Sequence, residues 1–419
     1  MDPSLFSFRL KADNVKHELV NLKQLVFEVT DACNLRCKYC VFGEFYSGFD
    51  QRVSQFLSFS EAKAVIDYLV DLWSHNAVAA ASSQLCISFY GGEPLLNVPL
   101  IRQVVDYVHE IQVPKTITFS MTTNCVLLDR YMDYLVENDF HLLCSLDGNS
   151  RSDAYRIRQD GSPSYDQVFA NIKLLQKKYP DYFVRNVDFN AVLHNLNDVP
   201  GLLSFFKQEF DKVPMISELN AAGIRKDQKD IFLKTFRSMR DDLFQANNRE
   251  NLTKQLGFEA PDTQEMFFYF NTSLGNVFET YSDLLSKNDN VPQIPSGTCL
   301  PFSRKLFVKA NGKIMPCERI HHNFSAGSVK EGKVYLDIQE VADCFNFYLK
   351  KITPRCSVCA SKESCGRCFY NIDGIESDHF VCDSFMTLSQ LKQKEHYYTQ
   401  YLYHHPSLYR EFMNEITLD

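Results

Sequence analysis

Residues 24–40 read QLVFEVTDACNLRCKYC, and the rest of the chain is best read outward from this stretch. Its first seven residues are mostly apolar and include β-branched side chains, which predicts a strand. Cys33, Cys37 and Cys40 follow directly. A loop of three cysteines is not typical of core packing, and no fourth Cys or His stands nearby to close a structural zinc site. Iron–sulfur cubanes normally take four thiolates, so three would leave one iron open to an outside ligand.

Strand-like and helix-like runs alternate from this point onward. We expect further strands at residues 85–90, 116–122, 141–146, 183–193 and 216–220. Amphipathic helices are expected between them, at 60–73, 100–111, 129–137, 165–178 and 199–210. The first of these begins at Ser60 as N-cap, without a capping box because Lys63 stands three positions on. Six β–α units in series predict an α/β fold with a parallel sheet, either open or an incomplete barrel. Chemistry then gathers at the carboxyl ends of the strands.

The composition excludes several classes of protein. With 419 residues, 45% hydrophobic and 23% charged, the chain is typical of globular proteins of two or three domains and unlike disordered or fibrous ones. The net charge of −8 argues against a basic nucleic-acid binder. The first residues lack the pattern of a secretory signal, and no apolar run approaches the roughly 18 residues of a membrane span. We therefore expect a cytoplasmic protein that binds neither nucleic acid nor membrane.

Fourteen cysteines are the outstanding feature of the composition. A disulfide scaffold would be shorter and richer in Cys, and clustered cysteines in a reducing compartment more often bind metal or act in catalysis. Beyond the first group, a second group lies at Cys356, Cys359, Cys365 and Cys368, flanked by Cys299, Cys317 and Cys382. This distribution predicts five segments: an N-terminal extension (1–22), the β–α units (23–222), a charged helical connector (223–295), a metal-stapled domain (296–390) and a C-terminal helix (391–419).

The first cysteine group, with Tyr39 inside it, resembles the signature of radical S-adenosylmethionine (SAM) enzymes. Tyr90–Pro94 resembles the GGEP motif of that family, and Thr122–Asn124 and Ser145–Gly148 resemble two further motifs, each after a predicted strand. The resemblance spans residues 24–222. It implies a partial (β/α)6 barrel in which a cluster passes one electron to SAM, and the resulting 5′-deoxyadenosyl radical abstracts hydrogen from a substrate.

The resemblance also implies roles for single residues. The metal ligands would be Cys33, Cys37 and Cys40, and SAM would be bound by Tyr39, Gly91, Gly92, Glu93, Asn124, Ser145 and Arg156. Two glycines allow close backbone approach, and the Glu93 carboxylate can hold the methionine ammonium. Arg156 would lie near the SAM carboxylate, although an exposed helix-face arginine is equally ordinary. Cys125 stands where the family usually has Gly, and we expect it to pack in the core.

The second cysteine group, together with Gly312, resembles the SPASM domain of radical SAM enzymes that act on peptides and proteins. A pair of zinc knuckles does not explain Gly312 and Cys317. The resemblance implies two auxiliary 4Fe–4S clusters, hence three in all. One would be held by Cys356, Cys359, Cys365 and Cys382, and the other by Cys299, Cys317 and Cys368. We expect Cys344, in a predicted helix at 342–349, to be buried and inert.

Three functional hypotheses follow. The first is a radical SAM maturase that forms a thioether or carbon–carbon crosslink in a ribosomally made precursor peptide. The second is an anaerobic sulfatase-maturating enzyme making formylglycine, and the third is a non-catalytic, metal-stapled peptide binder. Related sulfatase-maturating enzymes have an Asp where Glu318 stands, so Glu318 is a candidate catalytic base; a cluster partner or an ion pair with Arg319 are alternatives.

The first hypothesis also implies partners. A flavodoxin- or ferredoxin-type protein would donate electrons. Leader recognition would use the connector, the barrel rim or a separate leader-binding protein.

Overall fold

The computed structural model describes residues 8–47, 49–76, 84–221, 223–273 and 294–414. These residues form two compact units. The larger unit comprises Ala12–Leu256 and Leu300–Val341, and the smaller one comprises Met1–Lys11, Gly257–Cys299 and Ala342–Asp419. The five segments expected from the sequence stay predictions, and their parts at 1–7, 274–293 and 415–419 lie outside the described residues.

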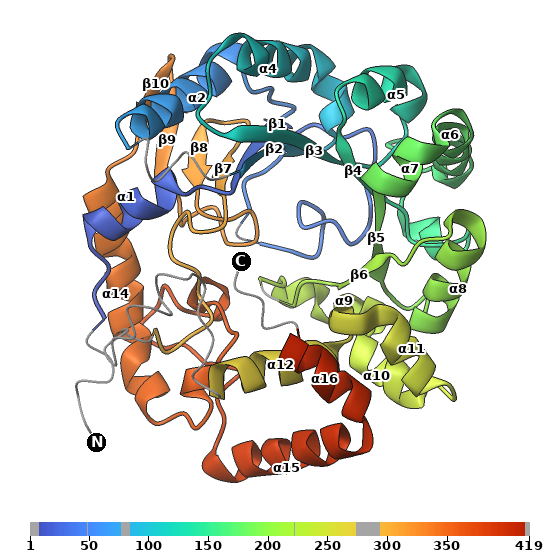
Figure 1. The fold of residues 1–419 in the computed structure, drawn as a ribbon, viewed down its shortest axis with the longest axis vertical. Coiled ribbons are helices and arrows are strands. Elements are labelled where there is room, and N and C mark those ends of the chain that lie inside the picture. Colours follow the sequence, from blue (N-terminus) through green and yellow to red (C-terminus); the bar gives the residue numbers. More distant parts are fainter. Residues whose placement is uncertain (1–7, 48, 77–83, 222, 274–293, 415–419) are drawn as a thin grey trace. The chain divides into compact units, whose positions relative to one another are not determined.

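The larger unit is built on one sheet, in which ten strands are described (Figure 1). Their order is β10-β9-β8-β7-β1-β2-β3-β4-β5-β6. The six strands from β1 to β6 are mutually parallel and follow the order of the chain, which confirms the expected α/β fold. They are β1 (Gln24–Thr30), β2 (Gln84–Gly91), β3 (Thr116–Thr123), β4 (His141–Ser145), β5 (Val187–Leu193) and β6 (Met215–Glu218).

Four short strands extend the sheet beyond β1 and were not expected from the sequence. β7 (Leu306–Val308) is parallel to β1, and β8 (Lys313–Met315), β9 (Gly327–Lys330) and β10 (Lys333–Tyr335) continue antiparallel. Strands of three or four residues give little alternation to recognise, which is why the pattern missed them. They place the segment with Gly312 and Cys317 in the larger unit.

Amphipathic helices connect the parallel strands as predicted (Figure 1). Between β1 and β6 lie α2 (Phe59–Ser74), α4 (Val98–Glu110), α5 (Leu128–Glu137), α6 (Tyr165–Lys178), α7 (Pro180–Asn186) and α8 (Val199–Phe210), with the 3-10 turns η2 (Pro94–Asn97) and η3 (Ser152–Tyr155). The unit also contains α1 (Ala12–Val20), η4 (Lys226–Gln228), α9 (Lys229–Thr235), α10 (Met239–Gln245) and α11 (Arg249–Leu256). Short helices thus occupy much of the part of the predicted connector that belongs to this unit, and the connector itself stays a prediction.

Two local predictions were wrong. Residues 183–186 belong to helix α7 rather than to strand β5, because Pro180 stands at the start of this helix, where its fixed φ favours helical geometry. The N-cap of α2 is Ser58, not Ser60. Ser58 forms a complete capping box with Glu61. The Ser58 hydroxyl accepts a hydrogen bond from the Glu61 amide, and the Glu61 carboxylate accepts one from the Ser58 amide.

The smaller unit is mainly helical. Its elements include η5 (Gly257–Glu259), α12 (Pro261–Ser273), η6 (Lys362–Ser364), η7 (Phe369–Asn371), α15 (Leu388–His404) and α16 (Pro406–Asn414). Helix α14 (Ile338–Ser357) covers the helix expected around Cys344. The expectation that Cys344 is buried was wrong, because this side chain is exposed. Among the helices described in either unit, none combines the length and apolar character that crossing a membrane requires.

A buried ionic cluster attaches the β7–β8 turn to the loop that follows β1. The Lys309 ammonium is 3% exposed and lies 2.8 Å from an Asp50 carboxylate oxygen, and Lys313 contacts the other oxygen at 3.0 Å. His322 accepts a hydrogen bond from the Asp50 amide, 2.8 Å long. Burial raises the pKa of Asp50, but the hydrogen bonds from the two lysines outweigh it and hold the pKa below its ordinary value.

Replacing Asp50 with Ala should therefore lower the free energy of unfolding by about 3 kcal/mol, because Lys309 is left buried without its carboxylate. The measurement is denaturant-induced unfolding of the whole chain. Lys207→Ala is the matched control: it removes an exposed pair with Asp211 and should change stability by less than about 0.5 kcal/mol. Equal effects of the two substitutions would show that the cluster does not stabilise the unit.

Candidate functional site

A cavity of about 300 Å³ lies where the parallel strands end. Side chains from the loop after β1 and from the carboxyl ends of β2 to β6 line it, as expected for a parallel α/β sheet. The lining residues are Cys33, Leu35, Cys37, Tyr39, Cys40, Val41, Phe42, Tyr46, Arg52, Tyr90, Gly91, Gly92, Glu93, Thr122, Thr123, Asn124, Ser145, Arg156, Asn190, Val192, Glu218, Leu219 and Asn220.

The structure brings together all ten residues that the sequence assigned to this part of the site, namely Cys33, Cys37, Cys40, Tyr39, Gly91, Gly92, Glu93, Asn124, Ser145 and Arg156. Other residues on the same cavity wall were not predicted from the sequence, among them Arg52, Asn190 and Glu218. Glu218 ends its strand, β6, and Asn190 lies in the middle of β5, and no motif marked either.

The cysteine loop is fixed by its backbone. The amides of Arg36 and Lys38 donate to the carbonyls of Ile157 and Tyr155, at 2.8 and 3.1 Å. These bonds align residues 35–38 with the segment after η3. The loop therefore has a defined path that does not depend on its thiols alone.

The three thiols suit a metal–sulfur cluster. Among the described residues, no group of three Cys, His, Asp or Glu side chains converges as the ligands of a single metal ion would. Cys33, Cys37 and Cys40 instead border one shared cavity. Burial raises the pKa of Cys37 to about 12, so this thiol needs a bound cation to become a thiolate. Soft thiolate donors of this kind select iron–sulfur clusters, zinc or copper.

Gly91 and Gly92 are required by the approach of two backbones. A Cβ atom on Gly91 would lie 2.2 Å from the Thr30 carbonyl oxygen, and one on Gly92 would lie 2.1 Å from that of Ala32. The same approach allows the amides of Gly92 and Glu93 to donate to the carbonyls of Thr30 and Ala32, both at 2.9 Å. The glycines thus join the turn after β2 to the start of the cysteine loop.

Glu93 is a fixed, buried carboxylate. It is 1% exposed, and it accepts hydrogen bonds from the amides of Leu95 and Asn124 and from the Thr123 hydroxyl, at 3.1, 2.8 and 2.7 Å. Burial raises the pKa of Glu93, and these three bonds oppose the rise. A carboxylate offers about four acceptor sites, so three bonds leave one for a ligand in the cavity.

Asn124 lies between the third strand and the cysteine loop. Its side-chain nitrogen, Nδ2, donates to the Asn34 side-chain oxygen at 2.7 Å and lies 3.8 Å from the Cys33 sulfur. The next residue, Cys125, has a φ of 62°, the left-handed region in which glycine is favoured. Its side chain is fully buried, in agreement with the expected packing role.

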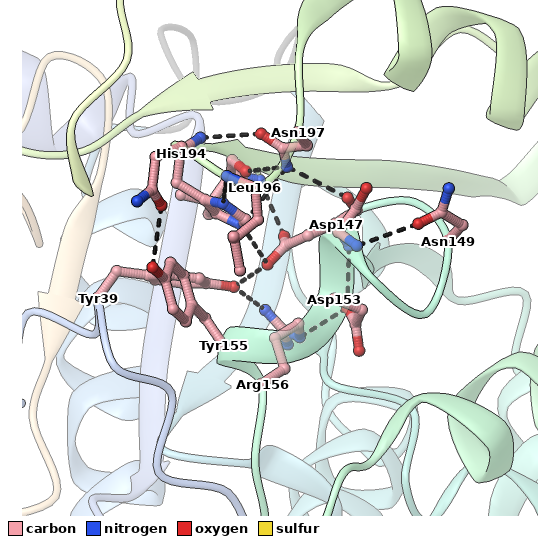
Figure 2. A network of polar contacts seen from close by, with 12 residues as sticks. Tyr39, Asp147, Asn149, Asp153, Tyr155, Arg156, His194, Leu196 and Asn197 are labelled. Atoms are coloured by element: carbon pink, nitrogen blue, oxygen red, sulfur yellow. Dashed lines mark hydrogen bonds and ion pairs between the residues drawn. The ribbon is translucent and has the colours of Figure 1, made fainter. Parts of the chain in front are cut away.

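A network of buried polar groups holds Tyr39 and Arg156 (Figure 2). The Tyr39 hydroxyl donates to Asp147, and Arg156 donates to the Tyr39 oxygen at 2.9 Å. The alternative reading of Arg156 as an exposed helix-face residue is wrong, because the side chain is 7% exposed and lines the cavity.

Glu318 is not among the residues described along the cavity wall, but it lies near Tyr90 of that wall: burial raises the pKa of the Tyr90 hydroxyl, and the Glu318 charge raises it too. The Glu318 carboxylate lies 3.0 Å from the Lys305 ammonium, and Arg319 is farther away at 4.0 Å. The expected ion pair with Arg319 is thus present only at the longer distance, the closer partner Lys305 was not predicted, and a catalytic role for Glu318 stays a prediction.

The second cysteine group gathers within the smaller unit. Burial raises the pKa of Cys356, and together with the neighbouring Cys365, Cys382 and Cys359 it brings this pKa to about 12. These are the four cysteines expected to share one cluster. Cys299 is likewise close enough to Cys368 to raise its pKa, after burial. Cys317, the third expected ligand of the other cluster, belongs to the larger unit.

Comparison with known proteins finds a family match over most of the residues that line this cavity. Residues 27–202 match the family described as Radical SAM superfamily. The chain is 26% identical to the radical SAM cyclopropyl synthase TigE of Paramaledivibacter caminithermalis, over 51% of this chain and 43% of that protein. It is 25% identical to the cysteine-type anaerobic sulfatase-maturating enzyme of Clostridium novyi, over 45% of this chain and 49% of that enzyme. The matches thus span less than half of either relative.

One solved structure matches over most of its length. It is native anSMEcpe with bound AdoMet and Kp18Cys peptide, at a TM-score of 0.56 and 16% identity, and the match covers 93% of this chain and 99% of that one. At this identity the likeness supports the fold alone.

The contact between the glycine turn and the cysteine loop predicts the effect of Gly92→Ala. The new Cβ would overlap the Ala32 carbonyl, so the loop must shift, at a cost of about 1–3 kcal/mol. After anaerobic reconstitution, the variant should bind about four irons fewer per chain than the wild type. Gly332→Ala is the control: its positive φ strains the backbone when a side chain is added, but the new Cβ meets open space, so the iron content should not change. Full iron content in both variants would contradict this prediction.

Proposed function

We propose, starting from the radical SAM domain over residues 27–202, that this chain cleaves SAM reductively to modify a ribosomally made peptide. The observation that carries the proposal is the shared cavity, where Cys33, Cys37 and Cys40 face the buried Glu93 and Arg156. One wall offers thiolates for a cluster, and the others offer an anion and a cation for the zwitterionic end of SAM.

Cys33, Cys37 and Cys40 would hold a 4Fe–4S cluster, which would supply the single electron needed to cleave SAM into methionine and a 5′-deoxyadenosyl radical that abstracts hydrogen. The chain's own residues bind and orient. Glu93 would accept a hydrogen bond from the SAM ammonium at its remaining acceptor site, and Arg156 would donate a charge-assisted hydrogen bond to the SAM carboxylate. Asn124 and Ser145 complete the wall between them.

The peptide substrate is supported by the kinds of relative that match. TigE is a cyclopropyl synthase and the Clostridium novyi relative matures sulfatases. We therefore assign this chain a precursor peptide, with a thioether or carbon–carbon crosslink as product and an external flavodoxin- or ferredoxin-type electron donor. The second cysteine group would hold two auxiliary clusters. Recognition of a leader sequence would fall to the connector, the barrel rim or a separate protein.

Sulfatase maturation is the second candidate, and the sequence match to the Clostridium novyi enzyme favours it. Mass spectrometry of modified peptides separates the two: formylglycine gives an aldehyde that reacts with hydrazides, whereas a crosslink joins two residues without one. A protein that neither cleaves SAM nor changes any peptide would instead fit the non-catalytic binder.

Replacing Cys33, Cys37 and Cys40 together with Ala should abolish formation of 5′-deoxyadenosine from SAM in dithionite-reduced, oxygen-free protein. The wild type should carry about 12 irons per chain in three cubanes, and the triple variant about 8, because the second cysteine group is untouched. Cys86→Ala is the matched control, since Cys86 contacts Ser120 within the sheet. SAM cleavage by the triple variant at the wild-type rate would exclude the radical reaction at this site.

A further inference from the structure

We propose that Tyr39 is a positioning residue: its hydroxyl, held between Asp147 and Arg156, sets the orientation in which Arg156 meets the carboxylate of SAM. This inference rests on the proposed function and deepens it. The sequence resemblance assigned Tyr39 to cofactor binding. The geometry points to an action through Arg156 instead.

The first step is the state of the Tyr39 hydroxyl, which is occupied on both sides (Figure 2). Its hydrogen is donated to Oδ2 of Asp147, and its oxygen accepts a hydrogen bond from Nη1 of Arg156 at 2.9 Å. A phenol hydroxyl has only one hydrogen to give. Because Asp147 takes it, Tyr39 has none left to donate to a cofactor.

Asp147 is itself held rigidly. Its Oδ1 accepts from the Val192 amide at 2.9 Å, and its own amide donates to Asp153 at 3.1 Å. Asn197 donates to its carbonyl at 3.2 Å. The partners of these bonds lie in the segment after β4, in β5 and in the loop after β5. The Asp147 carboxylate that binds Tyr39 is therefore held by the sheet and its loops and not by the cysteine loop.

His194 completes the pocket around the Tyr39 ring. The two rings stack at a centroid distance of 5.8 Å, and Nε2 of His194 lies 3.8 Å from Oδ2 of Asp147. Nδ1 of His194 accepts from the Leu196 amide at 3.2 Å. In the neutral ring the hydrogen therefore stands on Nε2, on the side of Asp147. Ring stacking and the hydroxyl bonds together leave Tyr39 one orientation.

These contacts orient the guanidinium of Arg156. Its Nε lies 3.7 Å from Asp153 and its Nη1 donates to Tyr39, so two edges of the planar guanidinium are oriented by protein groups. No contact of the remaining nitrogen, Nη2, is described, and Arg156 lines the cavity, so we assign Nη2 to the SAM carboxylate. Because the fork is planar, fixing two edges sets the direction of the third.

The cysteine loop has a separate support, which makes the inference testable. Its backbone is bonded to the carbonyls of Tyr155 and Ile157 irrespective of the Tyr39 hydroxyl. Tyr39→Phe removes only that hydroxyl and keeps the ring against His194. We therefore expect the variant to bind its full iron complement and yet to bind SAM roughly ten-fold more weakly, the loss typical of one hydrogen bond to a charged group.

The decisive experiment is a double-mutant cycle on SAM affinity, measured by equilibrium binding to the reconstituted protein without oxygen. If Tyr39 acts through Arg156, the double variant Tyr39→Phe/Arg156→Lys binds SAM no more weakly than Arg156→Lys alone. The change that SAM causes in the EPR signal of the reduced cluster should also diminish in Tyr39→Phe. Tyr155→Phe is the control, because it removes a nearby hydroxyl that bonds Asn195 at 2.9 Å.

Three results would overturn the inference. They are wild-type SAM affinity in Tyr39→Phe, additive losses in the double variant, and loss of iron from Tyr39→Phe, which would make the residue a support of the loop itself. Failure of the proposed function looks different: the wild-type protein would then bind no SAM, and no variant would be informative relative to it.

Discussion

The site depends on a close contact between two stretches of backbone. These are residues 30–32 at the end of the first strand and residues 91–93 at the end of the second. Because Gly91 and Gly92 lack side chains, the amides of Gly92 and Glu93 reach the carbonyls of Thr30 and Ala32. β1 and β2 are paired neighbours whose register already shifts near Thr30. The contact brings the start of the cysteine loop against the turn that carries the buried Glu93 carboxylate.

The opposite side of the cysteine loop is held by a different kind of interaction. Tyr39 extends from the loop into a polar network built on Asp147, whose backbone and carboxylate are bonded to β5 and to residues after β4. The loop is thus fixed by backbone hydrogen bonds toward β2 and by a buried side chain toward β4 and β5. Burial makes such polar contacts costly to lose, which favours one geometry for the cavity wall.

The sequence predicted most of the parallel sheet because its strands are long, apolar and separated by helices of clear period; β1 has the predicted limits. It failed where the signal is short or comes from distant residues. Strands β7 to β10 span three or four residues each. The first residues of the strand predicted at 183–193 are helical, because Pro180 starts a helix that continues to Asn186. Motif residues of the cavity were predicted because they resemble the motifs of a known family, and each of those motifs follows a strand. Asn190 and Glu218 belong to no motif, and the Tyr39–Asp147–Arg156 contact joins residues more than a hundred positions apart. The exposure of Cys344 likewise depends on which face of α14 is covered.

The most direct test of the account is a crystal structure of the reconstituted protein with SAM, determined without oxygen. We expect a cluster held by Cys33, Cys37 and Cys40, with the methionine end of SAM on its open iron, the ammonium at Glu93 and the carboxylate at Arg156. A metal ion closed off by four protein ligands at these cysteines, or SAM bound away from Glu93, would contradict this expectation.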